Sequence, residues 1–155
     1  MKNIYYYTYD TIMGEITIAC EDDSIIYLEY GKNINFTGIN KRVCLLDEAY
    51  NQLTQYFSGK RKNFELKLNP KGTDFQKKVW QALTKIPYGK TVSYYDIACS
   101  IGNEKACRAV GMANNKNPIS IIIPCHRVIG KNGKMVGYAS GIDRKVFLLE
   151  LESKI

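Results

Sequence analysis

Apolar and aromatic residues gather in short runs along the first thirty residues, and turn-forming residues separate the runs. The runs cover residues 4–9, 14–19 and 25–30. Such runs are typical of β-strands, so this part of the chain is predicted to form an antiparallel meander. Residues 45–57 carry apolar positions at helical spacing and predict a helix that ends at Gly59. Residues 64–68 predict one further strand.

The pattern becomes helical after residues 69–72, whose Asn-Pro-Lys-Gly sequence is the best linker candidate in the chain. Thr73 and Gln76 match a capping box, in which the N-cap residue and the third helical residue satisfy each other's backbone donors. They predict a helix that ends before residues 87–89. Its apolar face is predicted to carry Phe75, Val79, Ala82, Leu83 and Ile86.

Two shorter helices are predicted next. Ser93 can cap the first, Gly102 and Asn103 make a tight turn, and residues 104–114 form the second. A short helix, a Gly-containing turn and a second helix make the helix-turn-helix pattern. On the second helix Ala106, Val110 and Ala113 are predicted to face the core, and Lys105, Arg108 and Met112 to line another side.

The remaining residues predict a strand, a hairpin and a helix. The strand is an isoleucine-rich run at residues 119–123. Residues 127–130 and 134–138 flank an Asn-Gly turn, which is a strong hairpin signal, so a wing is expected to follow the helix-turn-helix. Residues 143–152 are mostly apolar on one side and predict the last helix.

Charge divides the chain near the linker candidate. The net charge is +7, from 22 Lys and Arg against 15 Asp and Glu. Residues 1–70 are close to balanced, whereas most of the surplus lies between Lys71 and Lys145. A basic surplus favours an anionic partner such as nucleic acid. We therefore expect two domains, residues 1–70 and residues 71–155, with any DNA-binding part in the second.

Targeting signals and cysteine usage indicate the cellular compartment of the protein. The chain shows neither a signal peptide nor an apolar run long enough to span a bilayer, so a cytoplasmic protein without membrane association is expected. The five cysteines are irregularly spaced, which argues against a disulfide framework and favours buried free thiols. No Cys-x-x-Cys pair occurs and His126 is the only histidine, so no metal site is expected.

Cys125 is the one cysteine whose neighbours suggest chemistry. It follows the isoleucine run and Pro124, and His126 and Arg127 come directly after it. A thiol is a nucleophile only as the thiolate, and a neighbouring base or positive charge raises the thiolate fraction. Adjacent residues on a strand point to opposite faces, however. From these residues alone, a buried cysteine beside a surface histidine is an equally open interpretation.

The motifs of residues 73–152 resemble, in order and spacing, those of the O6-alkylguanine-DNA alkyltransferases, also called methylated-DNA–protein-cysteine methyltransferases. The central motif is Pro-Cys-His-Arg-Val at residues 124–128. The others are Phe75-Gln76, Val79-Trp80-Gln81-Ala82-Leu83, Ile86-Pro87-Tyr88-Gly89, Val92-Ser93-Tyr94, Arg108-Ala109-Val110-Gly111, Asn117-Pro118, Gly137-Tyr138 and Leu148-Leu149 with Glu152. The first seventy residues resemble the variable domain of that family only in outline.

The resemblance implies a fold and a reaction. The fold is an N-terminal ribonuclease-H-like α/β domain with a small antiparallel sheet, followed by a C-terminal helical domain with a winged helix-turn-helix. The reaction moves the alkyl group of O6-alkylguanine in double-stranded DNA irreversibly to Cys125, in a single turnover and without a cofactor. His126 is implied to act as base through a water, and Glu152 to orient the imidazole. A monomer is expected.

The same resemblance assigns the DNA and substrate contacts. Tyr94 is implied to hydrogen-bond the flipped guanine, and Arg108 to enter the base stack in place of the extruded nucleotide. Asn117 is implied to tie the recognition helix to the active-site segment. The other DNA contacts are expected from Ser93, Asn103 and Lys105. The remaining pocket residues are expected to be Val128, Tyr138 and Ala139.

Two other function classes stay open at this point. A winged-helix sensor of alkyl damage without catalysis explains the basic second half and Arg108, but it gives no role to Cys125, His126 and Glu152 together. Alkyltransferase-like proteins of that kind replace the cysteine, which is present here. A cysteine hydrolase would use Cys125 and His126, but it needs an oxyanion hole and turnover, for which the sequence offers no further signature.

Overall fold

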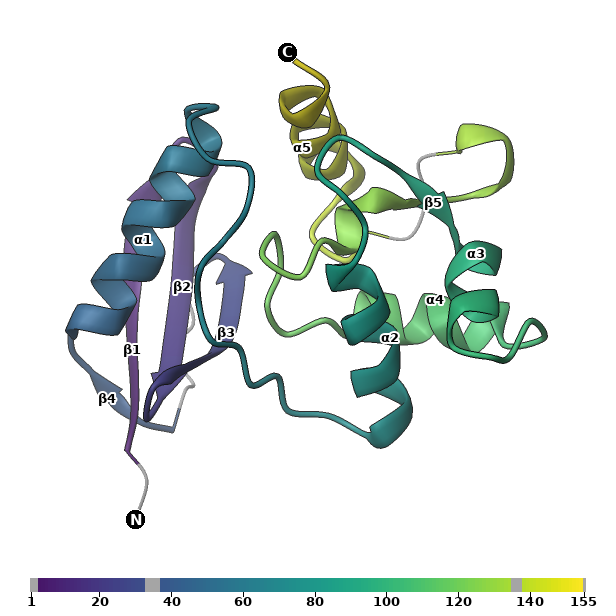
Figure 1. The fold of residues 1–155 in the computed structure, drawn as a ribbon. Helices are drawn as coiled ribbons and strands as arrows, with labels where there is room; N and C mark the ends of the chain where they lie inside the picture. Colours follow the sequence, from purple (N-terminus) through teal and green to yellow (C-terminus); the bar gives the residue numbers. More distant parts are fainter. Residues whose placement is uncertain (1–2, 33–36, 135–137, 155) are drawn as a thin grey trace. The chain divides into compact units, whose positions relative to one another are not determined.

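The fold is taken from a computed structural model, which describes residues 3–32, 37–134 and 138–154. The chain divides into two compact units, Met1–Lys71 and Gly72–Ile155 (Figure 1). The first contains a four-stranded sheet and one helix, and the second contains the other helices and a two-stranded sheet. The predicted fold class, an α/β unit followed by a helical unit, is confirmed.

The sheet of the first unit has the strand order β3-β2-β1-β4. Strands β1 (Ile4–Thr11), β2 (Gly14–Glu21) and β3 (Ser24–Tyr30) form the predicted antiparallel meander. The expectation of a purely antiparallel sheet is wrong, because β4 (Ile39–Asn40) pairs with β1 in parallel. At two residues β4 is too short to leave a sequence pattern.

Helix α1 (Cys44–Phe57) confirms the predicted helix and packs its apolar side on the sheet (Figure 1). The core here consists of Leu46, Ala49, Leu53 and Tyr56 from α1 and Ile16, Ile18, Ile25 and Leu28 from the sheet. The strand predicted at residues 64–68 is wrong. Only Leu68 bridges to Ile25, because the backbone of Glu65 is instead bonded to the side chain of Gln52, its N–H at 2.8 Å and its carbonyl at 3.3 Å.

In the second unit, helix α2 (Asp74–Thr84) begins with the predicted capping box of Thr73 and Gln76. Its buried side also carries Trp80, whose indole N–H donates to the carbonyl of Ala113 at 2.8 Å. This bond ties α2 to the later helix α4. Gly72 is needed beside the indole, since a Cβ there would come within 2.4 Å of Trp80.

The helix-turn-helix consists of α3 (Tyr94–Ser100), which Ser93 caps as predicted, a turn at Gly102, and α4 (Cys107–Asn115). Helix α4 starts three residues later than predicted. Residues 103–106 form a turn, because Ala106 donates back to the carbonyl of Asn103 and no side chain caps an earlier start. Within α4 the predicted faces are confirmed, with Val110 and Ala113 buried and Arg108 and Met112 exposed. Lys105 and Ala106, which were predicted on the same helix, precede it, and Ala106 is only half-buried.

The strand predicted at residues 119–123 is wrong, although the segment is largely buried. Ile121 has a φ of 73°, and Ile122 and Ile123 donate to carbonyls only two and four residues back. These local bonds make a coiled turn, in which only Ile119 forms a β-bridge. The strand nearby is β6 (Val128–Ile129), which pairs in parallel with β5 (Val92–Ser93).

The predicted wing is described only in part. Asn132 and Gly133 adopt the left-handed conformation of a tight turn, and the N–H of Gly130 donates to the carbonyl of Lys134 at 2.8 Å. Three residues of the second arm, 135–137, lie outside the described residues. The first arm pairs with β5 through β6.

Helix α5 (Ile142–Ser153) confirms the last predicted helix, but its buried side is Lys145, Leu148 and Glu152, two of which are charged.

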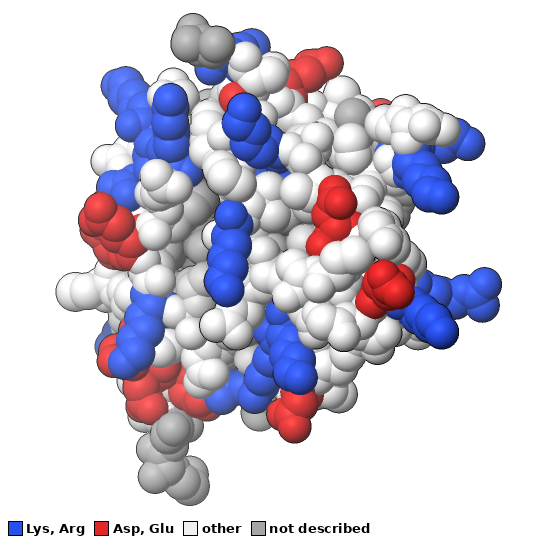
Figure 2. All heavy atoms as spheres, turned by 45° about the vertical axis from the view of Figure 1, so that its right-hand side comes forward, with Lys and Arg blue, Asp and Glu red and all other residues white. Residues whose placement is uncertain are grey.

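The burial of the cysteines also differs from expectation. Only Cys20 and Cys125 are buried, whereas Cys44 begins α1 and Cys99 lies on α3 with exposed side chains. Lys and Arg side chains are spread over the face seen in Figure 2. No helix within the described residues is long and apolar enough to cross a membrane.

Candidate active site

Cys125 lies in a 3₁₀ turn, Cys125–Arg127, which follows the buried isoleucine segment. Cys125 is only 4% exposed. The backbone around it is fixed, because its N–H donates to the carbonyl of Ile123 at 2.8 Å and its own carbonyl accepts from the amide of Asn114 at 3.5 Å. Since the backbone turns here, the strand geometry that would separate neighbouring side chains does not apply to Cys125 and His126.

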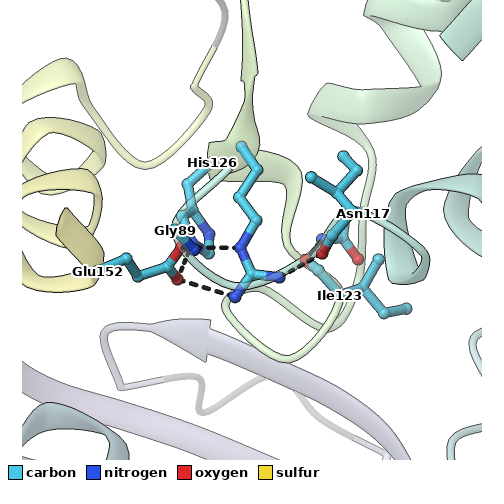
Figure 3. A network of polar contacts seen from close by, with 7 residues as sticks. Gly89, Asn117, Ile123, His126 and Glu152 are labelled. Carbon is cyan, nitrogen blue, oxygen red and sulfur yellow. Dashed lines mark hydrogen bonds and ion pairs between the residues drawn. The ribbon is translucent and has the colours of Figure 1, made fainter. Parts of the chain in front are cut away.

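Asn117 links the end of α4 to the segment that leads to Cys125. Its buried side-chain amide donates to the carbonyl of Ile123 at 2.8 Å, and its side-chain oxygen accepts from the N–H of Ile119 at 3.0 Å. Figure 3 shows Asn117 beside Ile123. The side chain satisfies two backbone groups of a buried loop, which would otherwise cost free energy.

His126 is completely buried and paired with Glu152 of α5. Its Nε2 lies 2.7 Å from Oε2 of Glu152. A carboxylate only accepts hydrogen bonds, so Nε2 carries the proton and Nδ1 keeps its lone pair. Nδ1 has no hydrogen-bond partner among the described residues. Burial lowers the pKa of His126 in spite of the opposing effect of Glu152, so the imidazole is neutral at pH 7 and able to accept a proton.

Arg127 completes the group around Glu152. Its Nε and Nη2 donate to the two carboxylate oxygens at 2.8 and 3.0 Å. The third guanidinium nitrogen donates to the carbonyl of Ile86 at 2.7 Å, and the group lies over the ring of Tyr88, 5.7 Å from its centroid. The arginine therefore joins α5 to the segment after α2 through one planar cation.

Gly89 supplies the last donor to Glu152, from its backbone N–H to Oε1 at 3.3 Å. Its φ of +78° strains any residue with a side chain, and a Cβ would come within 3.1 Å of the carbonyl of Glu152. Together with His126 and Arg127, this contact gives both carboxylate oxygens at least two donors each. The carboxylate is therefore fixed in position and fully hydrogen-bonded.

Lys145 is a second buried cation of the site. Its side chain has no exposed surface, and Nζ donates to the carbonyl of Val128 at 2.5 Å. Burial lowers the pKa of Lys145 to about 8, an effect that nearby Cys125 partly opposes.

Replacing Lys145 with Met is expected to change the dependence of stability on pH. Between the lowered pKa of about 8 and the ordinary value of 10.5, the unfolded chain binds a proton at Lys145 that the folded chain does not. Wild-type stability therefore rises across this window, by at most about 3 kcal/mol, relative to the Met variant. Urea unfolding of both proteins between pH 7 and 10.5 measures the difference, and parallel curves would contradict it.

Tyr94 begins α3, close to Cys125. Burial, and secondarily the charge of Cys125, raise the pKa of Tyr94, so its phenol stays protonated and able to donate a hydrogen bond. The ring lies over α4 at Gly111, where an added Cβ would be 3.8 Å from the ring carbons. A glycine there lets α3 and α4 approach each other closely.

The other predicted site residues lie on the surface or beside the turn. Asn103 and Lys105 in the turn and Arg108 on α4 are exposed. The hydroxyl of Ser93 is used to cap α3, where it accepts from the N–H of Asp96. In the predicted pocket Val128 and Tyr138 are buried and Ala139 is exposed. Among the described residues, no three His, Cys, Asp or Glu side chains are placed to share a metal ion.

Sequence reasoning gave no role to several residues that the structure places in the site. These are Gly89, Asn114, Arg127 and Lys145. A usable signal existed for two of them. Asn114 lies four residues after Val110, and Lys145 lies three before Leu148, so each is a polar residue at the spacing of a buried helix face.

Known proteins match nearly the whole chain. Residues 4–70 match the ribonuclease-like domain of 6-O-methylguanine DNA methyltransferase, and residues 74–154 match the DNA binding domain of the same family. A methylated-DNA–protein-cysteine methyltransferase of Methanosarcina acetivorans is 49% identical over 159 residues, which cover 96% of this chain and 98% of the relative. The constitutive methylated-DNA–protein-cysteine methyltransferase of Bacillus subtilis is 48% identical and covers 96% of this chain and 94% of its own.

Solved structures agree with these matches. Mycobacterium tuberculosis OGT in complex with DNA superimposes with a TM-score of 0.90 at 46% identity, covering 96% of this chain and 92% of its own. The O6-methylguanine methyltransferase of the same organism has a TM-score of 0.87 at 45% identity, covering 97% and 93%. The resemblance noted in the motifs is therefore confirmed and extends over both units.

Proposed function

The chain belongs to the 6-O-methylguanine DNA methyltransferase family, and on this basis we propose that it repairs DNA by transferring the alkyl group of O6-alkylguanine to Sγ of Cys125. The observation that carries the proposal is the buried group formed by Cys125, His126 and Glu152. It supplies a thiol, a neutral imidazole with an unused nitrogen, and a fixed carboxylate. This is the order of nucleophile, base and orienting group.

The reaction needs one displacement at carbon. The thiol proton passes to His126 at Nδ1, through a water molecule as in the family, and the sulfur lone pair forms a bond to the alkyl carbon. The bond between that carbon and O6 of guanine breaks, and the electron pair stays on the base. The base takes up one proton, which balances the proton that His126 accepted and then releases to water, and it stays in the strand as ordinary guanine. The thioether formed on Cys125 has no route back, so each chain reacts once.

Tyr94 is proposed to assist the leaving base. Its phenol stays protonated because burial raises the pKa of Tyr94, and a donor to the guanine ring offsets the negative charge that develops there. The surroundings of Cys125 contribute the rest of the pocket, with Val128, Tyr138 and Ala139 as the proposed lining. Asn117 is proposed to hold the turn in position relative to α4.

DNA binding is proposed for the helix-turn-helix surface. A thiol that is 4% exposed cannot reach a base inside a duplex, so the damaged nucleotide must be extruded, at a cost of a few kcal/mol. Arg108 is proposed to fill the gap in the stack, while Ser93, Asn103 and Lys105 bind nearby. Phosphate contacts release counterions, so affinity is expected to fall with salt. Nucleophile, base and carboxylate all come from one chain, which supports action as a monomer. A cytoplasmic location and a reaction without a cofactor are part of the same proposal.

Intact-protein mass spectrometry tests the proposal directly. The protein is mixed with an excess of duplex DNA containing O6-methylguanine, and peptide mapping follows. One added methyl group per chain, located on Cys125, is the expected result. Continued release of product beyond one equivalent would indicate a hydrolase. An unchanged mass with intact lesion, despite tight DNA binding, would leave a damage sensor.

A further inference from the structure

We propose that Arg127 is a positioning residue for alkyl transfer, which shares the carboxylate of Glu152 with His126 so that the imidazole stays neutral with its lone pair at Nδ1. The inference rests on the proposed function, because it assigns a role within the same site. In the proposed reaction Arg127 transfers no proton and forms no bond to the substrate. It acts through Glu152.

The contacts of Arg127 are too specific for a simple buried counterion. The residue is 7% exposed, and its guanidinium donates to both oxygens of Glu152 and to the carbonyl of Ile86. A planar group with three bonded nitrogens has one orientation, so the carboxylate that it holds has one orientation as well. Arg127 therefore fixes the position of Oε2, the oxygen of Glu152 that accepts from Nε2 of His126.

Because Arg127 shares the negative charge of Glu152, it affects the protonation state of His126. Three charged groups act on the imidazole, namely Glu152 and Lys145 from α5 and Arg127 from its own turn. Glu152 favours the protonated ring, whereas Arg127 and Lys145 oppose it. Without Arg127 the full negative charge of Glu152 would face His126 and stabilise the imidazolium. A protonated His126 has no lone pair at Nδ1, so it cannot accept the thiol proton.

The sole histidine of the chain makes the test unambiguous. Its imidazole C–H signals in a proton NMR spectrum are followed against pH in the wild type and in Arg127→Met. The rate of methyl transfer to Cys125 is measured on the same samples by quenched-flow mass spectrometry. Arg61→Ala is the matched control, because it removes an arginine whose side-chain partners are Gln55 and Asn63 of the first unit.

In Arg127→Met, His126 is expected to titrate at higher pH than in the wild type. Methyl transfer at neutral pH is expected to be about 10- to 100-fold slower, which is the loss typical when the residues that orient a metal-ligating histidine are removed. A slower variant with an unchanged His126 titration would overturn the inference, since Arg127 would then be structural only. An unchanged rate would overturn it too. If the Met variant does not fold, Arg127→Gln, which keeps a donor toward Glu152, is read by the same two measurements.

Failure of the proposed function gives a different result. If the wild type itself transfers no methyl group, the proposed function fails, whatever the titration shows. If the wild type transfers methyl and Arg127→Met matches it in both measurements, only the role of Arg127 fails.

Discussion

Cys125→Ser is expected to abolish alkyl transfer while leaving the fold and DNA binding unchanged. A serine hydroxyl is nearly isosteric with the thiol but is a far weaker nucleophile, since it does not ionise near neutral pH and its oxygen is less polarisable. The side chain is buried within one turn, so the substitution disturbs no exposed surface. Intact mass after incubation with O6-methylguanine duplex should therefore stay at that of the unmodified chain, with DNA affinity by fluorescence anisotropy as in the wild type.

Cys99→Ser is the control for this experiment. Cys99 is an exposed thiol on α3, within the same helix-turn-helix, so its removal tests whether accessibility rather than environment selects the alkylated residue. This variant is expected to accept one methyl group on Cys125 like the wild type. Methylation of Cys125→Ser, or loss of methylation in Cys99→Ser, would show that Cys125 is not the acceptor.

The elements that could be predicted from the sequence are those with local determinants. The capping box at Thr73 and Gln76 and the cap at Ser93 fix two helix starts through bonds that span three residues. The turns between β1, β2 and β3 are equally local. The helix α4, which has no side-chain cap, was misplaced by three residues at its start. A side-chain cap thus fixes a helix start where it is present, but the starts of α1 and α5, which also lack such a cap, are predicted to within one residue from the apolar spacing alone.

The isoleucine-rich segment shows why a hydrophobic run alone is not sufficient. Its composition correctly predicts burial, because removing a run of apolar side chains from water is favourable. It does not determine strand pairing, which needs a partner elsewhere in the chain. The chain turns at Ile121, within the isoleucine-rich segment, and the strand that follows it, β6, is the one that pairs with β5. The same turn is what places Cys125 and His126 outside strand geometry.

The active-site group depends on contacts between distant parts of the chain. Cys125 and His126 are adjacent, but the hydrogen bonds of Arg127 and His126 to Glu152 bridge 25 and 26 residues, and the bond from Arg127 to Ile86 bridges 41. Composition and periodicity carry no information on such contacts, so Glu152 was assigned only through the family resemblance. Arg127 and Lys145 had no assignment, because a charged residue is expected at the surface unless it is paired.

Glu152→Ala is expected to lower the free energy of unfolding by about 3–5 kcal/mol, the usual cost of removing one partner of a buried ion pair. The substitution leaves the guanidinium of Arg127 and the imidazole of His126 buried without their common acceptor. The rate of transfer is expected to fall as well, by about 10²- to 10⁴-fold, because His126 loses the group that fixes its tautomer. Chemical denaturation and single-turnover transfer measure the two effects.

Two variants separate stability from catalysis at this position. Glu150→Ala removes an exposed carboxylate from the same helix and is expected to change stability by no more than about 0.5 kcal/mol. Glu152→Gln keeps the shape and one acceptor oxygen but not the charge that orients and balances His126 and Arg127. It should recover part of the lost stability and little of the lost rate. If Glu152→Gln instead transferred alkyl groups like the wild type, the carboxylate would serve the fold and the imidazole would need no charged partner.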